Sequence, residues 1–442
     1  MLLIQGGLIK TITQGDICDG QILIDDGKIV SIGKRVNAPA GCEVFDAAGM
    51  LITPGLIDAH THIGLHEEAI RWEGADYNEM SGPVTPQMRG IDGLNPMDES
   101  LALALAGGVT SAVTGPGSAN VIGGTFVAIK LHGNCVDEMV LRDPVAMKAA
   151  MGENPKSCYG QEGRKEPVTR MGIAALLRST LAKARQYGKD REEDPKKCPF
   201  DLQMEALLPV IRREIPLKVH AHRADDMLTA LRIAREFQID ITLDHCTEGH
   251  LITDQLVKAG RPVLVGPSLH AKSKFELKNR TFATPGILAK AGLEVCIITD
   301  APVIPLQYLP LAAGLAIRYG MDEEDAWKAI TINPAHVAGV DARVGSLEAG
   351  KDADIAIFSG NPLREIQAQA VQVFVNGKPV LYRVLICLEE KSSCLQGLGA
   401  ALGTTRLRRP GSDRPGTVCP RSGYSMTGWR SRLAMKITAS MM

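Results

Sequence analysis

Aromatic residues are scarce in this chain: phenylalanine, tryptophan and tyrosine together make up 4% of its 442 residues. Proteins that bind single-stranded nucleic acids rely on stacking against such rings, so this composition argues against that role. Charge of one sign is also lacking, because the formal net charge is -1 and provides no global field toward nucleic acid or a membrane surface. We therefore expect neither nucleic acid nor a membrane as a partner.

Long apolar runs and paired cysteines are missing as well. No stretch of about 18 uninterrupted apolar residues occurs, so no transmembrane helix is predicted. The opening residues, MLLIQGGLIK, have no basic segment ahead of an apolar core, and no signal peptide is predicted. The 10 cysteines are scattered without a C-x-x-C pair. This pattern favours reduced thiols and a cytoplasmic location.

What remains is an ordinary globular composition, 45% apolar and 22% charged, in which two β-rich segments flank a longer one. Residues 1–53 contain short apolar or alternating runs, with a hairpin signal at Asp26-Gly27. Residues 343–383 are similar, with a turn signal at Asn376-Gly377. A sheet as small as either segment could form needs a partner. We predict that both segments pair into one small β-domain built from the two ends of the chain.

Residues 54–342 alternate short strand-like runs with longer helical stretches. This alternation predicts parallel βα units, and the length is that of a (β/α)8 barrel, the TIM barrel, with insertions. An open doubly wound sheet is the alternative, but it would carry a glycine-rich phosphate fingerprint that the glycines of residues 115–124 do not match. We interpret those glycines as an active-site loop or as turns. The predicted helices are 98–106, 169–186, 225–236 and 322–330, and the predicted strands are 111–113, 217–220, 240–244, 262–265 and 294–298.

Residues 384–442 differ in kind, with nine lysines and arginines against three acidic residues and no sustained periodicity. Proline, glycine and serine are scattered through the segment. We predict that this basic tail is disordered, or that it is an aberrant extension of the reading frame. A basic RNA-binding tail is the alternative.

Two histidines stand out in the run from Leu51 to Gly64, LITPGLIDAHTHIG. If the second apolar part of this run is a strand, side chains alternate between its faces, and His60 and His62 point the same way. Two imidazoles on one face of a buried strand end can hold a metal ion. Alone, a pair of histidines at this spacing is a weak signal.

Further residues of metal-ligand type close other predicted strands. His220 and His222 end one strand, His245 ends the next, and Asp300 follows a third. In a (β/α)8 barrel the carboxyl ends of the strands converge on one rim, which is where active sites form. Imidazoles and carboxylates gathered there suit zinc or a related divalent ion. The sequence therefore predicts one shared metal site.

In its sequence motifs the chain resembles the metal-dependent amidohydrolase superfamily. PGLIDAHTHIG resembles the opening of its barrel, and ITDAPVIP with AITINPAHVAGVDARVGSLEAGKDADIAIFSGNP resembles its end. DYNEMSGPVTPQMRGIDGLNP, PGSANVIGG and GENPK are most similar to the imidazolonepropionase-like and Xaa-Pro dipeptidase-like branch. The resemblance covers about residues 1–383. It implies a (β/α)8 barrel with a small β-sandwich from both termini, and a homo-oligomer.

The resemblance also implies a set of metal ligands. It assigns His60, His62 and Asp300 to a first divalent ion, and His220 and His245 to a second. Zinc is the expected metal, and a site with a single ion stays open. Asp300 is further implied to carry the proton during catalysis.

A bridging ligand is expected on the fourth strand of the barrel, where the family has a carboxylated lysine or, in some members, a glutamate. Glu153, in the GENPK segment, is the predicted ligand. Lys130 and Lys148 are its rivals.

Four residues are candidates for contacts with the substrate: His222, His270, Lys156 and Arg164. His222 follows His220 on the same face, so it contacts the substrate or replaces His220 as a ligand. His270 lies in a loop with Lys272 and Lys274, where it is predicted to bind a substrate carboxylate.

The implied activity is hydrolysis of an amide-type C–N bond in a dipeptide, an N-acyl amino acid or a cyclic amide, by metal-activated water. A heterocycle deaminase is the alternative enzyme. Deaminases of the family carry H-x-x-E on strand 5, whereas this chain has His220-Ala-His222-Arg223, without a glutamate. A non-catalytic scaffold is the alternative outside enzymes, and the complete set of candidate ligands argues against it. A nucleic-acid module would rest on the basic tail alone.

Overall fold

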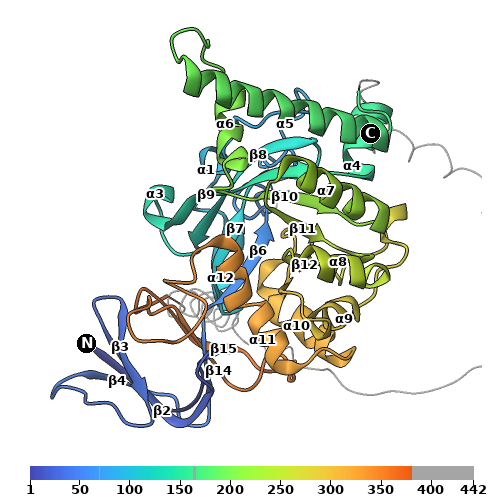
Figure 1. The fold of residues 1–442 in the computed structure, drawn as a ribbon. Coiled ribbons are helices and arrows are strands. Elements are labelled where there is room, and N and C mark those ends of the chain that lie inside the picture. Colours follow the sequence, from blue (N-terminus) through green and yellow to red (C-terminus); the bar gives the residue numbers. More distant parts are fainter. Residues whose placement is uncertain (69, 163–165, 381–442) are drawn as a thin grey trace, which may run out of the picture. The chain divides into compact units, whose positions relative to one another are not determined.

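The computed structural model describes residues 1–68, 70–162 and 166–380, in which helices and strands form an α/β fold with two sheets (Figure 1). The predictions made for residues 384–442 and for Arg164 lie outside the described residues. No helix in the described ranges is long and apolar enough to cross a membrane.

The first sheet, sheet A, draws its strands from both ends of the described chain, as predicted. Its order is β16-β15-β14-β5-β1-β2-β3, with β4 beside β1. The C-terminal strand β14 pairs antiparallel with β5, so that Ile355 lies opposite Pro54 and Phe358 opposite Leu51. The strands are β1 (Leu2–Lys10), β2 (Asp16–Asp25), β3 (Lys28–Gly33), β4 (Glu43–Asp46), β5 (Leu51–Pro54), β14 (Ile355–Phe358), β15 (Ala370–Val375) and β16 (Lys378–Pro379).

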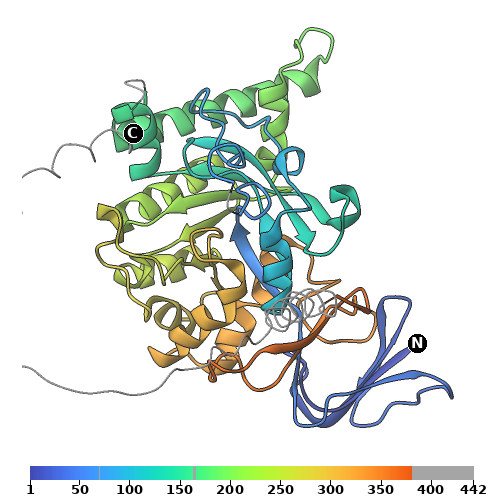
Figure 2. The same ribbon diagram turned by 180° about the vertical axis from the view of Figure 1, so that it is seen from behind.

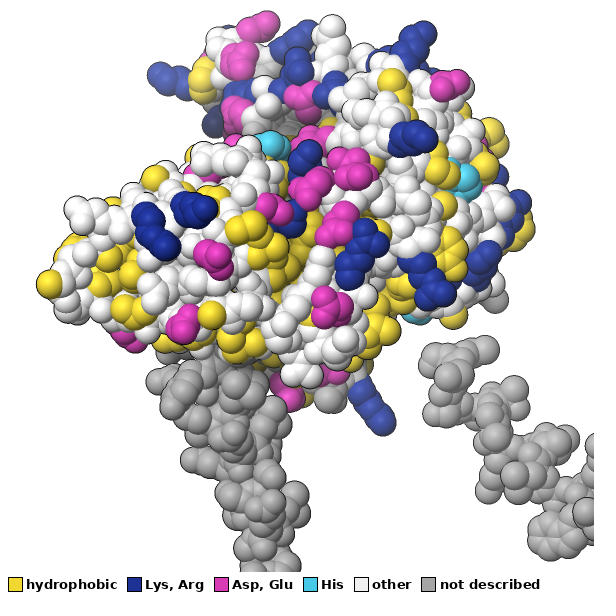
Figure 3. Space-filling model, turned by 90° about the horizontal axis from the view of Figure 1, so that it is seen from below, with side chains coloured by type: hydrophobic (Ala, Val, Ile, Leu, Met, Phe, Trp, Pro, Cys, Tyr) yellow, Lys and Arg dark blue, Asp and Glu magenta, His cyan; other side chains and the backbone are white. Residues whose placement is uncertain are grey.

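Strand β1 changes partners halfway along its length. Its residues Leu2–Gln5 pair with β4, whereas Leu8 and Ile9 pair with β5. The glycines between these stretches permit the change, because Gly6 has a φ of +85° and a Cβ on Gly7 would lie 2.8 Å from the Ile52 side chain. In the view from below, acidic, basic and hydrophobic side chains are intermixed on the surface (Figure 3).

The second sheet, sheet B, is a nearly closed barrel. Its order is β13-β12-β11-β10-β9-β8-β7-β6. An eight-stranded barrel joined to a sheet from the chain ends confirms the predicted fold class, and the doubly wound alternative is wrong. The strands are β6 (Leu56–Thr61), β7 (Val109–Thr114), β8 (Ile122–Lys130), β9 (Val140–Ala150), β10 (Leu217–Ala221), β11 (Ile241–His245), β12 (Val263–Val265) and β13 (Val295–Ile297).

The barrel departs from the predicted all-parallel order at β8, which runs antiparallel to both β7 and β9. The reason is the length of the connections. Residues 115–121 and 131–139 are too short for the crossover that two parallel neighbours require. As a result Lys130, the last residue of β8, lies opposite Ser111 near the start of β7.

Lys130 is therefore at the end of the barrel that adjoins sheet A. Its buried ammonium lies 2.8 Å from Asp352 Oδ2 and 2.9 Å from Asp354 Oδ1, both from the segment that leads into β14. It joins the barrel to sheet A and does not reach the rim where His60 ends β6.

A buried carboxylate helps to close the barrel between β6 and β13. Asp58 Oδ2 accepts hydrogen bonds from the backbone N–H of Thr299 at 2.8 Å and from its hydroxyl at 2.7 Å. Above it, the N–H of His62 donates to the carbonyl of Ala301 at 2.7 Å. These hydrogen bonds between the two strand ends place Asp300 directly beside His60 and His62.

Helices cover the outside of sheet B, and Figure 2 shows the same arrangement from behind. Side-chain caps define where several begin, as at Asp98 before α2, Thr169 before α5 and Asp322 before α11. The four predicted helices correspond to α2, α5, α7 and α11, although α5 continues to Glu193. The helices are α1 (Gly90–Gly93), α2 (Glu99–Ala106), α3 (Val136–Met139), α4 (Glu153–Pro155), α5 (Arg170–Glu193), α6 (Leu202–Ile211), α7 (Ala224–Phe237), α8 (Thr253–Ala259), α9 (Thr284–Lys290), α10 (Leu309–Arg318), α11 (Glu323–Ala329) and α12 (Ile332–Ala338).

Candidate metal centre

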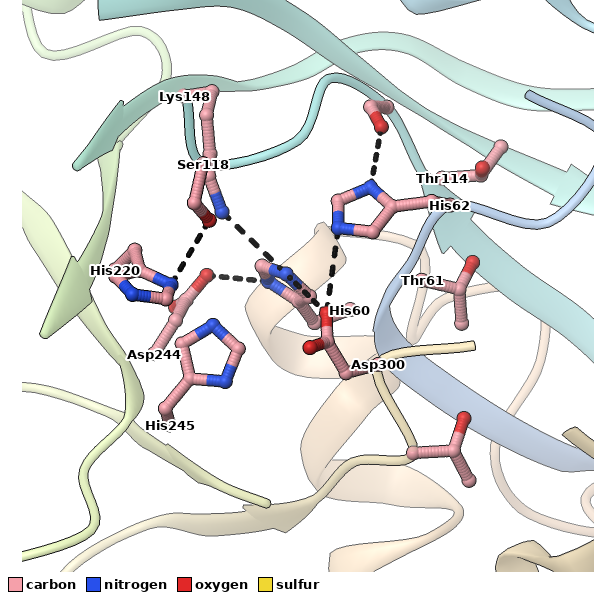
Figure 4. Close-up of polar contacts among 12 residues, drawn as sticks. His60, Thr61, His62, Thr114, Ser118, Lys148, His220, Asp244, His245 and Asp300 are labelled. Atoms are coloured by element: carbon pink, nitrogen blue, oxygen red, sulfur yellow. Dashed lines mark hydrogen bonds and ion pairs between the residues drawn. The ribbon is translucent and has the colours of Figure 1, made fainter. Parts of the chain in front are cut away.

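Histidines from three strands meet at the carboxyl end of the barrel (Figure 4). The ring centroid of His245, at the end of β11, lies 5.0 Å from that of His60 on β6 and 4.2 Å from that of His220 on β10. His62 and His222, each two residues further along, lie 5.3 Å from His60 and 4.7 Å from His220 respectively. All five side chains are buried.

Two overlapping groups of side chains have the spacing of a metal site. One consists of His220, His222 and His245, and the other of His60, His245 and Asp300. Within each group the potential ligand atoms lie within 4.8 Å of one another. His245 belongs to both groups, so the two could share a ligand or hold neighbouring ions.

The outer ring nitrogens show which tautomer three of these histidines adopt. Nδ1 of His60 lies 2.6 Å from Asp244 Oδ2, Nδ1 of His62 lies 2.7 Å from the Gly115 carbonyl, and Nδ1 of His245 lies 2.9 Å from the Gly266 carbonyl. Each partner is an acceptor, so each Nδ1 carries the proton and donates it. The Nε2 atoms of the neutral rings are therefore left with lone pairs, which is the form that binds metals.

These lone pairs face a carboxylate oxygen. Asp300 Oδ1 lies 3.3 Å from Nε2 of His60 and 3.3 Å from Nε2 of His62. Asp300 Oδ1 and Nε2 of both His220 and His245 are buried without a hydrogen-bond partner among the described residues. Burying converging acceptors costs free energy unless a cation binds between them. The donor set, imidazole nitrogens with one carboxylate, fits a divalent ion such as zinc.

Burial keeps the imidazoles in the neutral form. It is the largest cause that lowers the pKa of His60, and it lowers the pKa values of His220, His222 and His245 well below their ordinary value. Burial acts to raise the pKa of Asp300, but that pKa nevertheless lies well below its ordinary value. The carboxylate of Asp300 is therefore ionised at neutral pH.

These directions predict how the metal-free protein responds to acid. Unfolded histidines titrate near pH 6.5, whereas four buried ones stay neutral to lower pH, so below about pH 6.5 the unfolded chain binds more protons. As the pH is lowered below this value, the free energy of unfolding should decrease by up to about 1.4 kcal/mol per pH unit for each such histidine. Urea unfolding in EDTA at about pH 7.5 and about pH 5.5 measures this difference. Equal stability at both values would contradict the neutral assignment.

Lys148, on β9, reaches the same group of histidines. Its side chain is fully buried and its Nζ lies 3.5 Å from His60 Nε2. Burial is the main cause that lowers the pKa of Lys148 to about 8, so about one tenth of its amine is unprotonated at pH 7, far more than for an ordinary lysine. Of the rivals considered for the fourth strand, Lys148 is the one that the structure brings to the histidines.

Glu153 lies elsewhere. Strand β9 ends at Ala150, Gly152 follows with a φ of +80°, and the chain then turns into α4, which begins at Glu153. The Glu153 side chain lines a separate cavity together with Lys156, and its Oε2 lies 3.4 Å from the N–H of Glu276. The structure does not bring Glu153 or Lys156 together with the histidines.

Asp244 supports His60 from behind. Besides its contact with His60 Nδ1, Asp244 Oδ2 lies 3.1 Å from Nζ of the buried Lys218, and Oδ1 accepts from the Thr242 hydroxyl at 2.8 Å. Burial acts to raise the pKa of Asp244, but Lys218 and His60 lower it well below its ordinary value. Asp244 thus fixes the orientation and tautomer of His60.

We expect Asp244→Asn to weaken zinc binding about 10- to 100-fold, because carboxylates that orient a metal-binding histidine typically contribute that much. Competition with a zinc chelator measures the affinity. Thr242→Val serves as a control that removes a neighbouring hydroxyl and keeps the carboxylate. Unchanged zinc affinity in Asp244→Asn would contradict this role.

A cavity of about 390 Å³ opens onto the histidines. His222 and His270 are lining residues, as are Asn154 of α4 and Lys274 from the segment after β12. Sequence reasoning named His222 and His270 and missed Ser118, whose hydroxyl lies 2.9 Å from His220 Nδ1. Ser118 belongs to the glycine-rich segment after β7, so its position agrees with the interpretation of that segment as an active-site loop.

Backbone strain is concentrated at the same rim. His245 has a φ of +70°, Cys246 a φ of +45° and Asp300 a φ of +55°. Non-glycine residues adopt this region at a cost and are found in it preferentially at functional sites. The turn at His245 brings its ring to the centre although its neighbour Asp244 already points into the barrel.

Comparison with known proteins agrees with this geometry. A model of the Amidohydrolase family matches residues 51–380, and the chain belongs to that family. The amidohydrolase tasK of Hapsidospora irregularis is 30% identical over 391 residues, which is 81% of this chain and 39% of the relative, so the chain spans only that share of tasK. The imidazolonepropionase of Idiomarina loihiensis is 25% identical over 80% of this chain and 89% of its own length.

Among solved structures, an amidohydrolase from Thermotoga maritima MSB8 is 41% identical with a TM-score of 0.83, covering 86% of this chain and 99% of that one. A Xaa-Pro dipeptidase with bound methionine, 17% identical with a TM-score of 0.53, covers 86% and 99% and shares the fold. The predicted superfamily is thereby confirmed, with an imidazolonepropionase among the distant relatives and a Xaa-Pro dipeptidase among the structures that share the fold.

Proposed function

We propose that this protein is a metal-dependent hydrolase that cleaves an amide-type C–N bond in a dipeptide, an N-acyl amino acid or a cyclic amide. One observation carries the proposal. Buried imidazole Nε2 atoms without protons converge with the ionised carboxylate of Asp300 at the floor of a cavity. Such a donor set binds a divalent ion beside a space that admits a small substrate.

The ligands divide between two positions. His60, His62 and Asp300 would hold one ion, and His220 and His245 would hold a second, with zinc as the expected metal. Lys148 would add a further ligand as a carbamate. Its neutral amine adds to carbon dioxide, forming an N–C bond while a proton leaves to solvent, and the product is a carboxylate at the position of Nζ. A pKa of about 8 makes the neutral amine available for this addition.

When bound, the metal would supply a Lewis acid that polarises the scissile carbonyl and makes water a stronger acid. Asp300 would accept the proton of the attacking water and donate it to the leaving nitrogen, because its side chain lines the cavity. His222 would contact the substrate carbonyl or act as a further ligand, since its Nδ1 is already occupied by the Thr247 hydroxyl at 2.7 Å. His270 would contact the more distant part of the substrate.

The strand-5 residues favour hydrolysis of an amide over deamination. His220 and His222 are followed by Arg223, and Arg223 pairs with Asp225, with the guanidinium nitrogen 2.8 Å from the carboxylate. The strand thus offers no glutamate at the position that family deaminases use. Similarity to an imidazolonepropionase and to a Xaa-Pro dipeptidase keeps both cyclic amides and dipeptides among the candidates.

A hydrolysis screen of the zinc-loaded protein tests the proposal. N-acyl amino acids, dipeptides, cyclic amides and aminopurines are incubated with wild-type protein and with His60→Ala as a control for contaminating activity. We expect cleavage of one of the first three classes, absent in the variant. Ammonia release from aminopurines alone would make the protein a deaminase, and no turnover of any class would favour the scaffold alternative.

A further inference from the structure

The cavity above the histidines carries one positively charged side chain. Among the described residues that line it, Lys274 is the single lysine or arginine, and Asp300 is the single aspartate or glutamate. Asp300 faces the Nε2 atoms of His60 and His62 on β6, whereas Lys274 comes from the loop after β12. A ligand in this cavity would therefore meet the metal-binding group on one wall and an ammonium on another.

The ammonium of Lys274 has two polar partners, Asn154 of α4 and Glu276, which lies two residues further along the same segment. Its Nζ donates to Asn154 Oδ1 at 2.7 Å and lies 2.9 Å from Glu276 Oε1. Glu276 is itself anchored, because its Oε2 accepts from the N–H of Glu153 at 3.0 Å. A lysine with this support loses little conformational entropy when it binds a ligand.

The two charges of this ion pair are not equally accessible. The side chain of Glu276 is 1% exposed and does not line the cavity, whereas that of Lys274 is 24% exposed and does. An incoming molecule therefore encounters the cation, with the carboxylate behind it. The ammonium has three N–H donors, and one of them is directed to Asn154, so donors remain for a ligand.

We propose that Lys274 binds a carboxylate of the substrate and makes the enzyme selective for amides that carry a free acid, such as N-acyl amino acids and dipeptides, over neutral amides. This inference rests on the proposed function, since the same cavity is taken to hold the scissile amide. A charge-assisted hydrogen bond in a partly enclosed site favours the acid over its neutral amide by roughly 10- to 100-fold.

Binding can be tested without turnover. N-acetyl amino acids and their primary amides are titrated by calorimetry into zinc-loaded Asp300→Asn protein, which is expected to keep the metal without turnover, with glycine, leucine, proline and histidine as the amino acids. The lysine variants below are made in the same Asp300→Asn background. We expect at least one acid to bind roughly 10- to 100-fold more tightly than its amide. Lys274→Met should abolish this preference while the zinc content stays unchanged, and Lys274→Arg should retain part of it.

Lys272→Met is the matched control, because Lys272 is in the same loop but binds the Lys278 carbonyl at the surface and does not line the cavity. It should keep the preference for acids. If Lys274→Met fails to fold, the double variant with Glu276→Gln removes both charges of the pair and replaces it.

Three outcomes would overturn the inference. The amides could bind as tightly as the acids, no member of the panel could bind, or the preference for acids could persist in Lys274→Met. These outcomes are separable from failure of the proposed function. An acid preference without hydrolysis leaves the role of Lys274 intact, whereas hydrolysis of neutral and acidic amides at equal rates supports the proposed function alone.

Discussion

Replacement of Lys148 by alanine should remove at least one zinc ion per chain and abolish hydrolysis. Lys148 is buried with its Nζ 3.5 Å from His60 Nε2, and as a carbamate it would supply a ligand that no neighbouring side chain can replace. Loss of a side chain that only orients a ligand costs about 10- to 100-fold in metal affinity, so loss of a ligand should cost more than about 100-fold. Zinc content after dialysis and the rate of hydrolysis measure the effect.

Two further variants separate a carbamate from a simple cation. Lys148→Arg keeps a positive charge but cannot form a carbamate, because guanidinium stays protonated, and it should be as inactive as Lys148→Ala. Glu153→Gln should keep zinc and activity, since Glu153 lines a different cavity. Retained zinc in Lys148→Ala together with lost zinc in Glu153→Gln would reverse the assignment of the fourth-strand ligand.

Asp300→Asn should keep most of the bound metal and lose turnover. The amide oxygen of asparagine can still reach a metal ion, but it cannot accept a proton at neutral pH. General acid–base catalysis by a positioned side chain contributes typically about 10²- to 10⁴-fold, and a loss of that size in kcat is expected. Steady-state kinetics on protein of matched zinc content measure it.

Asp341→Asn provides the control for this substitution, because Asp341 is an exposed carboxylate beside His336, far outside the lining of the cavity. Its activity should equal that of the wild type. Full activity in Asp300→Asn would refute the role of Asp300 as the proton carrier.

The sequence located most of the candidate site because its residues end apolar strands. His60, His220 and Asp300 each follow or close a buried run, and the convergence of strand ends in a barrel brings them to one rim. The pairing of the two chain ends was likewise predictable, since each segment is too small to form a stable sheet by itself. These inferences need only the direction of a strand and the place where it stops.

Strict alternation along β11 could not predict that Asp244 and His245 both serve the same site. Neighbours on a strand point to opposite faces, and Asp244 already faces the barrel interior next to Lys218. The ring of His245 joins it because the backbone turns to a φ of +70° there. That conformation depends on the surrounding fold and cannot be predicted from the residue type.

Lys148 was harder to choose because its strand is unusual. Strand β9 has 11 residues and pairs antiparallel with β8, so its functional residue lies inside an Ala- and Met-rich run rather than just after it. In the register of the sheet, Lys148 lies opposite Lys218 of β10, two residues before His220. Only this pairing across strands distinguishes Lys148 from Lys130 and Glu153.

The central claim is that the buried Nε2 atoms and Asp300 hold a divalent metal, and His245 offers the most direct test because it belongs to both groups of ligands. Zinc per chain is measured by elemental analysis after metal removal, reloading and dialysis, for wild-type protein and for His245→Asn, with His336→Asn as an exposed control. We predict one or two zinc ions in the wild type and the control, and loss of metal in His245→Asn. Wild-type protein without stoichiometric zinc, or undiminished zinc in His245→Asn, would contradict the account.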